Sequence, residues 1–174
     1  MLPVTKNPLG FCNLRTWQQA NEIFDCVESL CTSFPPKHPI TGQYLTDLKD
    51  QMIRSARSVV RNIEEGFART TTREYIQFLG YSYGSLQELI GDLEYCIKGQ
   101  IGESQWADKG YYLAKGEAKM LTSQIKSLEL KMTDDHTLSR NEQAQKILNV
   151  QKQQATEARE FLAELDEIIH KKSS

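Results

Sequence analysis

A short glycine–serine motif is the first place where residue types and spacing suggest catalysis. Gly80-x-Ser82-x-Gly84 matches the elbow that presents a nucleophilic serine in α/β-hydrolases. That elbow needs a strand, a sharp turn and a helix, whereas residues 75–93 keep one helical phase. At about 100° per residue, Ser82 falls in the middle of the apolar face of that helix. We therefore predict a buried serine that is bonded to a backbone carbonyl, not a hydrolase nucleophile.

Other catalytic or metal-binding patterns are weak. Glu167-x-x-His170 is half of a di-iron helix motif, but it occurs once, near the end of the chain, and di-iron bundles need two such helices. The chain has only three histidines and lacks a P-loop, a dinucleotide fingerprint and zinc-ligand spacing. We expect a protein that is not an enzyme and that has no cofactor or metal.

Arginines form the most prominent charged pattern. Between residues 54 and 73 the sequence has five arginines and only two glutamates, which gives a local charge of +3. Three lie on one face of a predicted helix and two follow in the next loop: Arg54, Arg57, Arg61, Arg69 and Arg73. One interpretation is a patch that binds nucleic-acid phosphates or a partner. The other is a solvated or subunit-facing stripe that Asp50 and Glu65 neutralise.

Three glycines lie on one side of a predicted helix, opposite its apolar face: Gly80, Gly84 and Gly91. Each glycine inside a helix costs about 1 kcal/mol relative to alanine. The cost is offset if the backbone of a neighbouring subunit packs closely there, so we predict a subunit interface. Glycines that are merely tolerated on the surface are the alternative.

Helical periodicity predicts five helices, and no strand is expected. The predicted helices span about 14–32, 42–65, 75–98, 105–132 and 139–170. Asn13 is expected as the first N-cap, Gly66 and Gly99 as the ends of the second and third helices, and Thr71-x-x-Glu74 as a capping box. The fold predicted is all-α: an antiparallel up-down four-helix bundle with an additional C-terminal helix.

The expected domains are an N-terminal arm (1–12), the bundle (13–132) and a C-terminal helical extension (133–174). The extension carries a weak heptad with a polar middle at positions 147, 151, 154, 158, 161, 165 and 168. Its helix could dock on the bundle, pair with another chain or project from it.

Composition points to a cytoplasmic protein. The 174 residues carry a formal net charge of −2, so there is no overall basic signal for nucleic acid. No apolar run approaches the length of a membrane span, and no signal-peptide pattern opens the chain. The four cysteines lack metal-site spacing, and we expect reduced, mostly buried thiols.

Several motifs occur in a fixed order along about residues 13–132, among them "LRTWQQA", "LKDQMIRSARSVVRNIEEGFAR" and "GSLQEL". In this order they resemble the bacterial family of 23S rRNA-intervening-sequence proteins. The positions that match the family pattern are Leu14, Trp17, Gln51, Arg54, Ser58, Asn62, Ile63, Glu65, Gly66, Gly84, Ser85, Leu86, Glu88 and Leu89. Glu64 departs from the pattern, which usually has a small residue there, and residues 134–174 have no counterpart in short members.

The resemblance implies a four-helix bundle that assembles as a homopentamer, with no enzymatic activity. Related proteins include the accessory variability determinant of diversity-generating retroelements, which is basic and binds nucleic acid and a reverse transcriptase. Two hypotheses follow: an oligomer that binds nucleic acid or a nucleoprotein partner such as a reverse transcriptase, or a protein-interaction scaffold without nucleic acid. They differ in whether Arg54, Arg57 and Arg61 face solvent.

Overall fold

The protein is a bundle of four long helices in the part of the chain that its computed structural model describes, residues 9–134 together with Gln153 and Thr156. The elements are the short 3₁₀ helix η1 (Gly10–Asn13), α1 (Arg15–Thr32), α2 (Thr46–Ala68), α3 (Thr72–Gly99) and α4 (Ser104–Asp134). No strand occurs among these residues, so the predicted all-α four-helix bundle is confirmed. The predicted fifth helix lies outside the described residues, except that Gln153 and Thr156 are helical.

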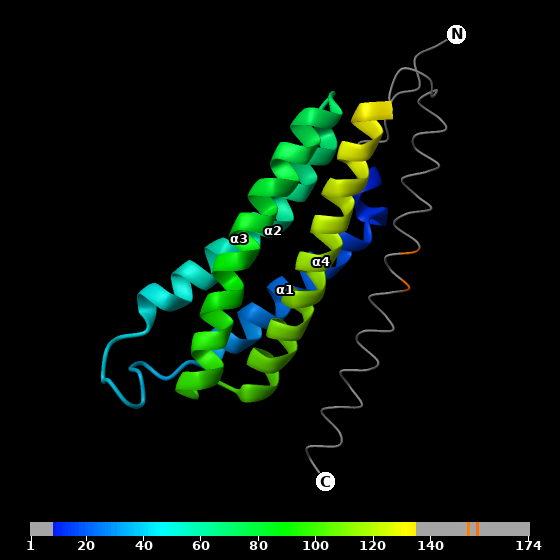
Figure 1. The fold of residues 1–174 in the computed structure, drawn as a ribbon. Helices are drawn as coiled ribbons and strands as arrows, with labels where there is room; N and C mark the ends of the chain where they lie inside the picture. Colours follow the sequence, from blue (N-terminus) through cyan, green and yellow to red (C-terminus); the bar gives the residue numbers. More distant parts are fainter. Residues whose placement is uncertain (1–8, 135–152, 154–155, 157–174) are drawn as a thin grey trace.

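Each helix packs against its two neighbours, so that α1, α2, α3 and α4 form a closed ring (Figure 1). Short connections over 69–71 and 100–103 join α2 to α3 and α3 to α4, as expected for antiparallel neighbours. The connection between α1 and α2 is longer, over 33–45, and carries one isolated bridge between Lys37 and Tyr44. The helices therefore run up and down in sequence order, with α1 and α4 closing the ring.

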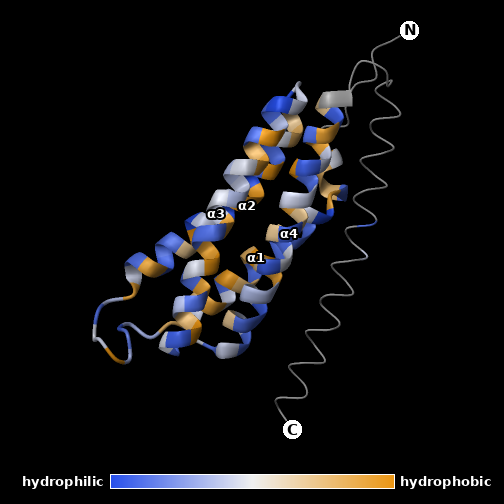
Figure 2. Cartoon of the chain, in the orientation of Figure 1, coloured by the Kyte–Doolittle hydropathy of each residue, from blue (hydrophilic) through white to orange (hydrophobic). Residues whose placement is uncertain are grey.

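Apolar stripes on all four helices meet along the axis of the bundle (Figure 2). Ile23 of α1, Met52 of α2, Leu86 of α3 and Leu121 of α4 are each completely buried. Burying such a side chain contributes about 1.5–3 kcal/mol relative to leaving it exposed. The polar faces of α2 and α3 are left on the outside, where the candidate site lies.

The boundary between α2 and α3 confirms one predicted end signal and corrects another. Thr71 is the N-cap of α3: its Oγ1 accepts from the Glu74 amide at 3.2 Å and lies 2.7 Å from Glu74 Oε2. Gly66 was predicted to end the preceding helix, but α2 continues to Ala68. A Cβ on Gly66 would lie 2.8 Å from Phe78 Cβ, so this glycine allows α3 to approach α2.

Of two other predicted helix boundaries, one is wrong and one is confirmed. Leu14, not Asn13, is the N-cap of α1, because residues 10–13 form η1 and Phe11 packs edge-on against Trp17, with ring centroids 5.4 Å apart. α3 ends at Gly99, as predicted, and its C-cap Gln100 takes the left-handed conformation with φ of 52°. A Cβ on Gly99 would lie 3.1 Å from His38 Nε2, so this glycine also allows His38 to pack closely against the end of α3.

All four cysteines are free thiols, and three of them are buried, as predicted. Burial raises the pKa of Cys31 to about 11 and that of Cys96 to about 12, which keeps these groups protonated. Within the described helices we find none that combines the length and apolar character of a membrane span.

Candidate functional site

Ser82, the one candidate nucleophile, is completely buried between α2 and α3. Its Oγ donates a hydrogen bond to the Val59 carbonyl at 3.0 Å. The prediction of a buried serine bonded to a carbonyl is therefore confirmed, although the carbonyl belongs to the neighbouring helix and not to its own. Because this hydroxyl is committed to the α2–α3 contact, the motif around Ser82 is structural.

An open polar groove lies on the outer side of the same contact. Its volume is about 420 Å³. Four side chains of α2 and two of α3 line it: Gln51, Arg54, Ser55, Ser58, Ser85 and Glu88. We call this surface the α2–α3 groove; it offers hydroxyls, an amide, one cation and one carboxylate to a ligand.

Hydroxyl groups join the two walls of the α2–α3 groove. Ser85 Oγ on α3 lies 2.9 Å from Ser58 Oγ on α2. Asn62 Nδ2, one turn after Ser58, donates both to that hydroxyl at 3.0 Å and to the Ser58 carbonyl at 2.8 Å. These bonds fix the wall positions before a ligand arrives, which lowers the entropic cost of binding.

Glu88 makes one end of the α2–α3 groove acidic, and Asp92, one turn later on α3, is hydrogen-bonded to the lining residue Gln51. Ser55 Oγ donates to Glu88 Oε2 over a long 3.4 Å, and one oxygen of Asp92 is buried without a hydrogen-bond partner. Burial raises the pKa of Asp92, the nearby Glu88 carboxylate raises it further, and a hydrogen bond from Gln51 opposes both. Phosphate groups are therefore disfavoured at this end, next to Glu88 and Asp92.

The three arginines of α2 are all exposed, and none of them forms an ion pair with another described residue. Arg54 borders the α2–α3 groove, whereas the Arg57 guanidinium lies 6.0 Å from the ring centroid of Phe24 on α1. The arginine face, defined as Arg54, Arg57 and Arg61, therefore spans α2 from its α3 side to its α1 side. Asp50 does not pair with it.

The other two predicted arginines are separate from this face. Arg69 lies at the end of α2 and has two contacts. It pairs with Glu65 at 3.8 Å, and its guanidinium lies 4.4 Å from the ring centroid of Phe78. Arg73 was predicted in a loop but occupies the first turn of α3, where it is exposed. The structure thus brings together three of the five predicted arginines.

Gly80, Gly84 and Gly91 follow one another along the outside of α3. A Cβ built on any of them would have no described atom within 4 Å. All three are exposed, and Tyr81, next to Gly80, is 51% exposed. This glycine face, defined as Gly80, Gly84 and Gly91, therefore leaves the α3 backbone accessible, and the subunit interface at these positions stays a prediction.

Comparison with known families decides which proteins this chain resembles. The family model of the 23S rRNA-intervening sequence protein matches residues 12–123. The chain belongs to this family. No curated protein matches this chain.

Most of the polar residues that carry the family likeness gather at the α2–α3 groove of this family member; Glu65, which pairs with Arg69, does not. Gln51, Arg54, Ser58, Ser85 and Glu88 line the groove, and Asn62 holds Ser58. Glu64, where the family pattern has a small residue, is explained here by Trp17, whose Nε1 donates to Glu64 Oε1 at 2.8 Å. The departure therefore fastens α1 to α2 and leaves the groove unchanged.

Sequence reasoning missed a second polar cluster in this family member, between α1 and α4. Glu117 and Gln19 are both completely buried. Gln19 Nε2 donates to the Leu113 carbonyl at 2.9 Å, but Gln19 Oε1 and both Glu117 oxygens lack a partner. The signal was present, because Glu117 stands four residues from both Leu113 and Leu121 on the apolar phase of its helix.

Proposed function

We propose that this family member is a cytoplasmic, non-enzymatic, oligomeric bundle that binds nucleic acid, or a nucleoprotein partner, through the arginine face of α2. The observation that carries the proposal is the exposure of Arg54, Arg57 and Arg61 on one helix without an ion pair to any described residue. Exposed guanidinium groups on one helix face can contact successive phosphates and release the counterions bound to the nucleic acid. Such contacts give affinity without reading base sequence.

The position of the acidic groups supports separate binding surfaces for nucleic-acid phosphates and for a protein. Glu88 lines the α3 side of the α2–α3 groove, whereas Arg57 and Arg61 lie outside the set of residues that line it. A phosphate backbone is therefore expected to follow α2, and the α2–α3 groove is left for polar contacts to a protein.

Reversing one charge on the arginine face tests nucleic-acid binding directly. Arg57→Glu is expected to abolish salt-sensitive binding of RNA or DNA in a gel shift, because it places an anion among the phosphate contacts. Arg57→Gln should lower the slope of log K against log salt by about 1. Lys126→Glu, which reverses an exposed charge on α4, is the matched control. Unchanged binding by Arg57→Glu would instead favour a scaffold that does not bind nucleic acid.

The open glycine face supports assembly with further copies of this chain, and the family resemblance points to a pentamer. Gly84→Leu should be tolerated within one chain, because its Cβ meets no described atom within 4 Å. In an oligomer that packs on this face the added side chain should collide with the neighbouring helix and lower the mass in solution. Light scattering after size exclusion measures the mass, and circular dichroism checks the helices. A variant that keeps both the mass and the helicity of the wild type would rule out this interface.

The partner class follows from the resemblance to retroelement accessory proteins. A reverse transcriptase is the partner we propose, with the arginine face shared between the enzyme and its nucleic acid. Retention of a reverse transcriptase by the wild type but not by Arg57→Glu, at low salt and with added RNA, would support this assignment.

A further inference from the structure

Every side chain that lines the α2–α3 groove is polar, and the formal charges of the lining cancel. Arg54 supplies a cation from the α2 wall, and Glu88 supplies a carboxylate from the α3 wall. The remaining lining side chains are three serines and one glutamine, which carry no charge. The groove therefore suits an uncharged polar group better than an ion.

The two opposite charges of the groove do not neutralise each other by direct contact. Arg54 and Glu88 are both exposed, and neither forms an ion pair with a described residue. The hydrogen bond that Glu88 Oε2 accepts from Ser55 is long, at 3.4 Å. A ligand between the walls would therefore meet guanidinium donors on one side and carboxylate acceptors on the other.

We propose that the α2–α3 groove binds the carboxamide of an asparagine or glutamine side chain of the protein partner. A carboxamide carries an acceptor oxygen and an NH₂ group with two donors on the same carbon atom. Its oxygen would accept from Arg54, and its NH₂ group would donate to Glu88. Both bonds would be charge-assisted, which makes them stronger than bonds between neutral groups. The proposal rests on the proposed function only in that a protein docks beside the arginine face.

A carboxamide–carboxylate contact of this type already exists at one end of the groove. The Gln51 side chain is hydrogen-bonded to Asp92, one turn after Glu88 on α3. Ser58 and Ser85, whose hydroxyls lie 2.9 Å apart, hold the walls together next to the proposed contact. Serine hydroxyls both donate and accept, so they are able to bind either end of the amide.

Charge complementarity excludes other occupants. Glu88 repels a phosphate or a carboxylate, and Arg54 repels an ammonium group. A nucleobase also offers donors and acceptors, but single-stranded bases are bound largely by stacking on aromatic rings. None of the six lining residues is aromatic.

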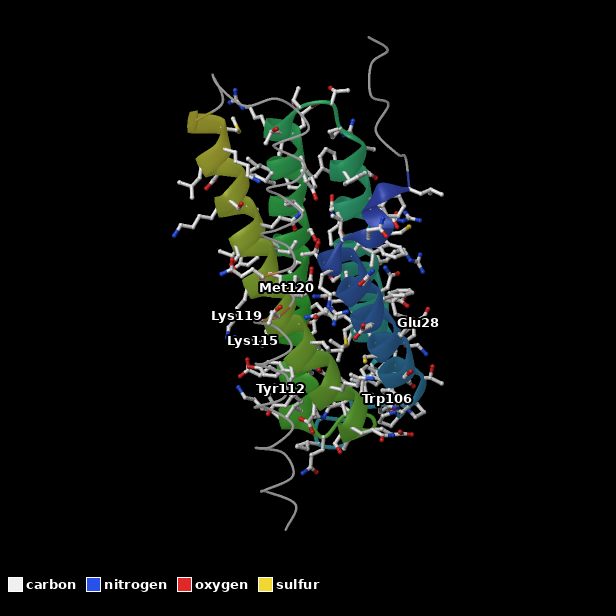
Figure 3. All side chains as sticks on the ribbon, turned by 90° about the vertical axis from the view of Figure 1, so that its right-hand side faces the viewer. Glu28, Trp106, Tyr112, Lys115, Lys119 and Met120 are labelled. Atoms are coloured by element: carbon white, nitrogen blue, oxygen red, sulfur yellow. The ribbon has the colours of Figure 1, made fainter. Side chains whose placement is uncertain are left out.

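The lysines of α4 do not alter this charge balance. Figure 3 views the bundle from the side on which Figure 1 draws α1 and α4, and it labels Lys115 and Lys119 on α4. No described residue of α4 lines the α2–α3 groove. The charges at the groove are therefore those of Arg54 and Glu88.

Three small probes that differ in charge test the proposal: propionamide, propionate and propylammonium. Each is titrated into the deuterated, ¹⁵N-labelled full chain, and NMR follows the backbone amide signals of residues 54–58 and 85–88. Propionamide should shift these signals to saturation, with an affinity at least about tenfold above that of either charged probe. Absence of saturable shifts, or equal binding of a charged probe, would overturn the proposal. Saturation by guanosine without a response to propionamide would assign the groove to a nucleobase instead.

Two variants should change the preference of the groove in opposite directions. Glu88→Gln leaves Arg54 as the charge of the groove and should bind propionate more tightly than propionamide. Arg54→Gln leaves Glu88 and should bind propylammonium more tightly. Glu129→Gln, which changes an exposed carboxyl on α4, is the control and should keep the wild-type preference. A Glu88→Gln protein with the wild-type preference would contradict the proposal. The probes contain no phosphate, so this result is independent of Arg57→Glu, which tests nucleic-acid binding.

Discussion

Replacing Glu117 with glutamine is expected to flatten the pH dependence of stability and to raise the free energy of unfolding at neutral pH. Glu117 is completely buried, and neither of its carboxyl oxygens has a hydrogen-bond partner. Burial raises the pKa of this carboxyl well above its ordinary value of 4.5; Arg15 opposes the shift and Glu22 adds to it. The folded protein therefore holds a proton on Glu117 that the unfolded chain releases.

The direction of the effect follows from this difference in proton binding. The contribution of neutral Glu117 to stability is complete below about pH 4.5, the pKa in the unfolded chain, and is lost as the pH rises towards the folded-state pKa. The loss amounts to at most about 1.4 kcal/mol per pH unit. Glutamine has the same shape without the proton equilibrium, and its amide can donate to the unpartnered Gln19 Oε1.

Urea denaturation between pH 4.5 and 8 measures this effect. The difference in unfolding free energy between Glu117→Gln and the wild type should grow with pH over this range. Glu129→Gln, which changes an exposed carboxyl on the same helix, should show no such growth. A Glu117→Gln difference that stays constant with pH would mean that Glu117 is ionised in the folded protein.

Gly66→Ala is expected to destabilise the bundle, although alanine is the better helix former. A Cβ at this position would lie 2.8 Å from Phe78 Cβ and 2.9 Å from Tyr75 Cδ2. Phe78 Cβ sits at the root of its side chain and cannot rotate away, so α2 and α3 must separate. Such overpacking costs about 1–3 kcal/mol, against a gain of about 1 kcal/mol in helix propensity.

Thermal unfolding of Gly66→Ala should therefore show a melting temperature several degrees below that of the wild type. Gly91→Ala is the control, since it makes the same substitution inside α3 with no described atom within 4 Å of the new Cβ. Compared at equal mass in solution, Gly91→Ala should be at least as stable as the wild type. If both variants were stabilised alike, the close approach at Gly66 would not be a structural constraint.

The sequence predicts the helices and their buried faces well, because both follow from local periodicity. The Thr71 capping box was predictable for the same reason, since its two partners are three residues apart. Gly66 and Asn13 were misassigned because the contacts that decide them come from distant residues: Phe78 meets Gly66, and Phe11 packs on Trp17. In the sequence alone, a glycine that ends a helix cannot be distinguished from a glycine that allows another helix to pack closely.

The candidate site was predictable only in part. The periodicity placed Arg54, Arg57 and Arg61 on one face of a helix but left open whether that face is exposed, and all three are exposed in the described chain. The α2–α3 groove was not foreseen, because it depends on the rotation of α2 against α3, which places Ser58 beside Ser85, 27 residues later. The periodicity of a sequence predicts which face of each helix is buried. It does not predict which side chains meet when two helices pack together.

The closing of the ring between α1 and α4 has a consequence for how the bundle opens. This seam joins the helices most distant in sequence, and it contains Gln19 and Glu117, each with a buried polar atom that lacks a hydrogen-bond partner. The seam thus has a high loop-closure cost and little polar compensation. It defines the boundary of a foldon: in native-state hydrogen exchange, α1 should detach before the α2–α3 hairpin, whose walls are bonded through Ser82, Ser58 and Ser85.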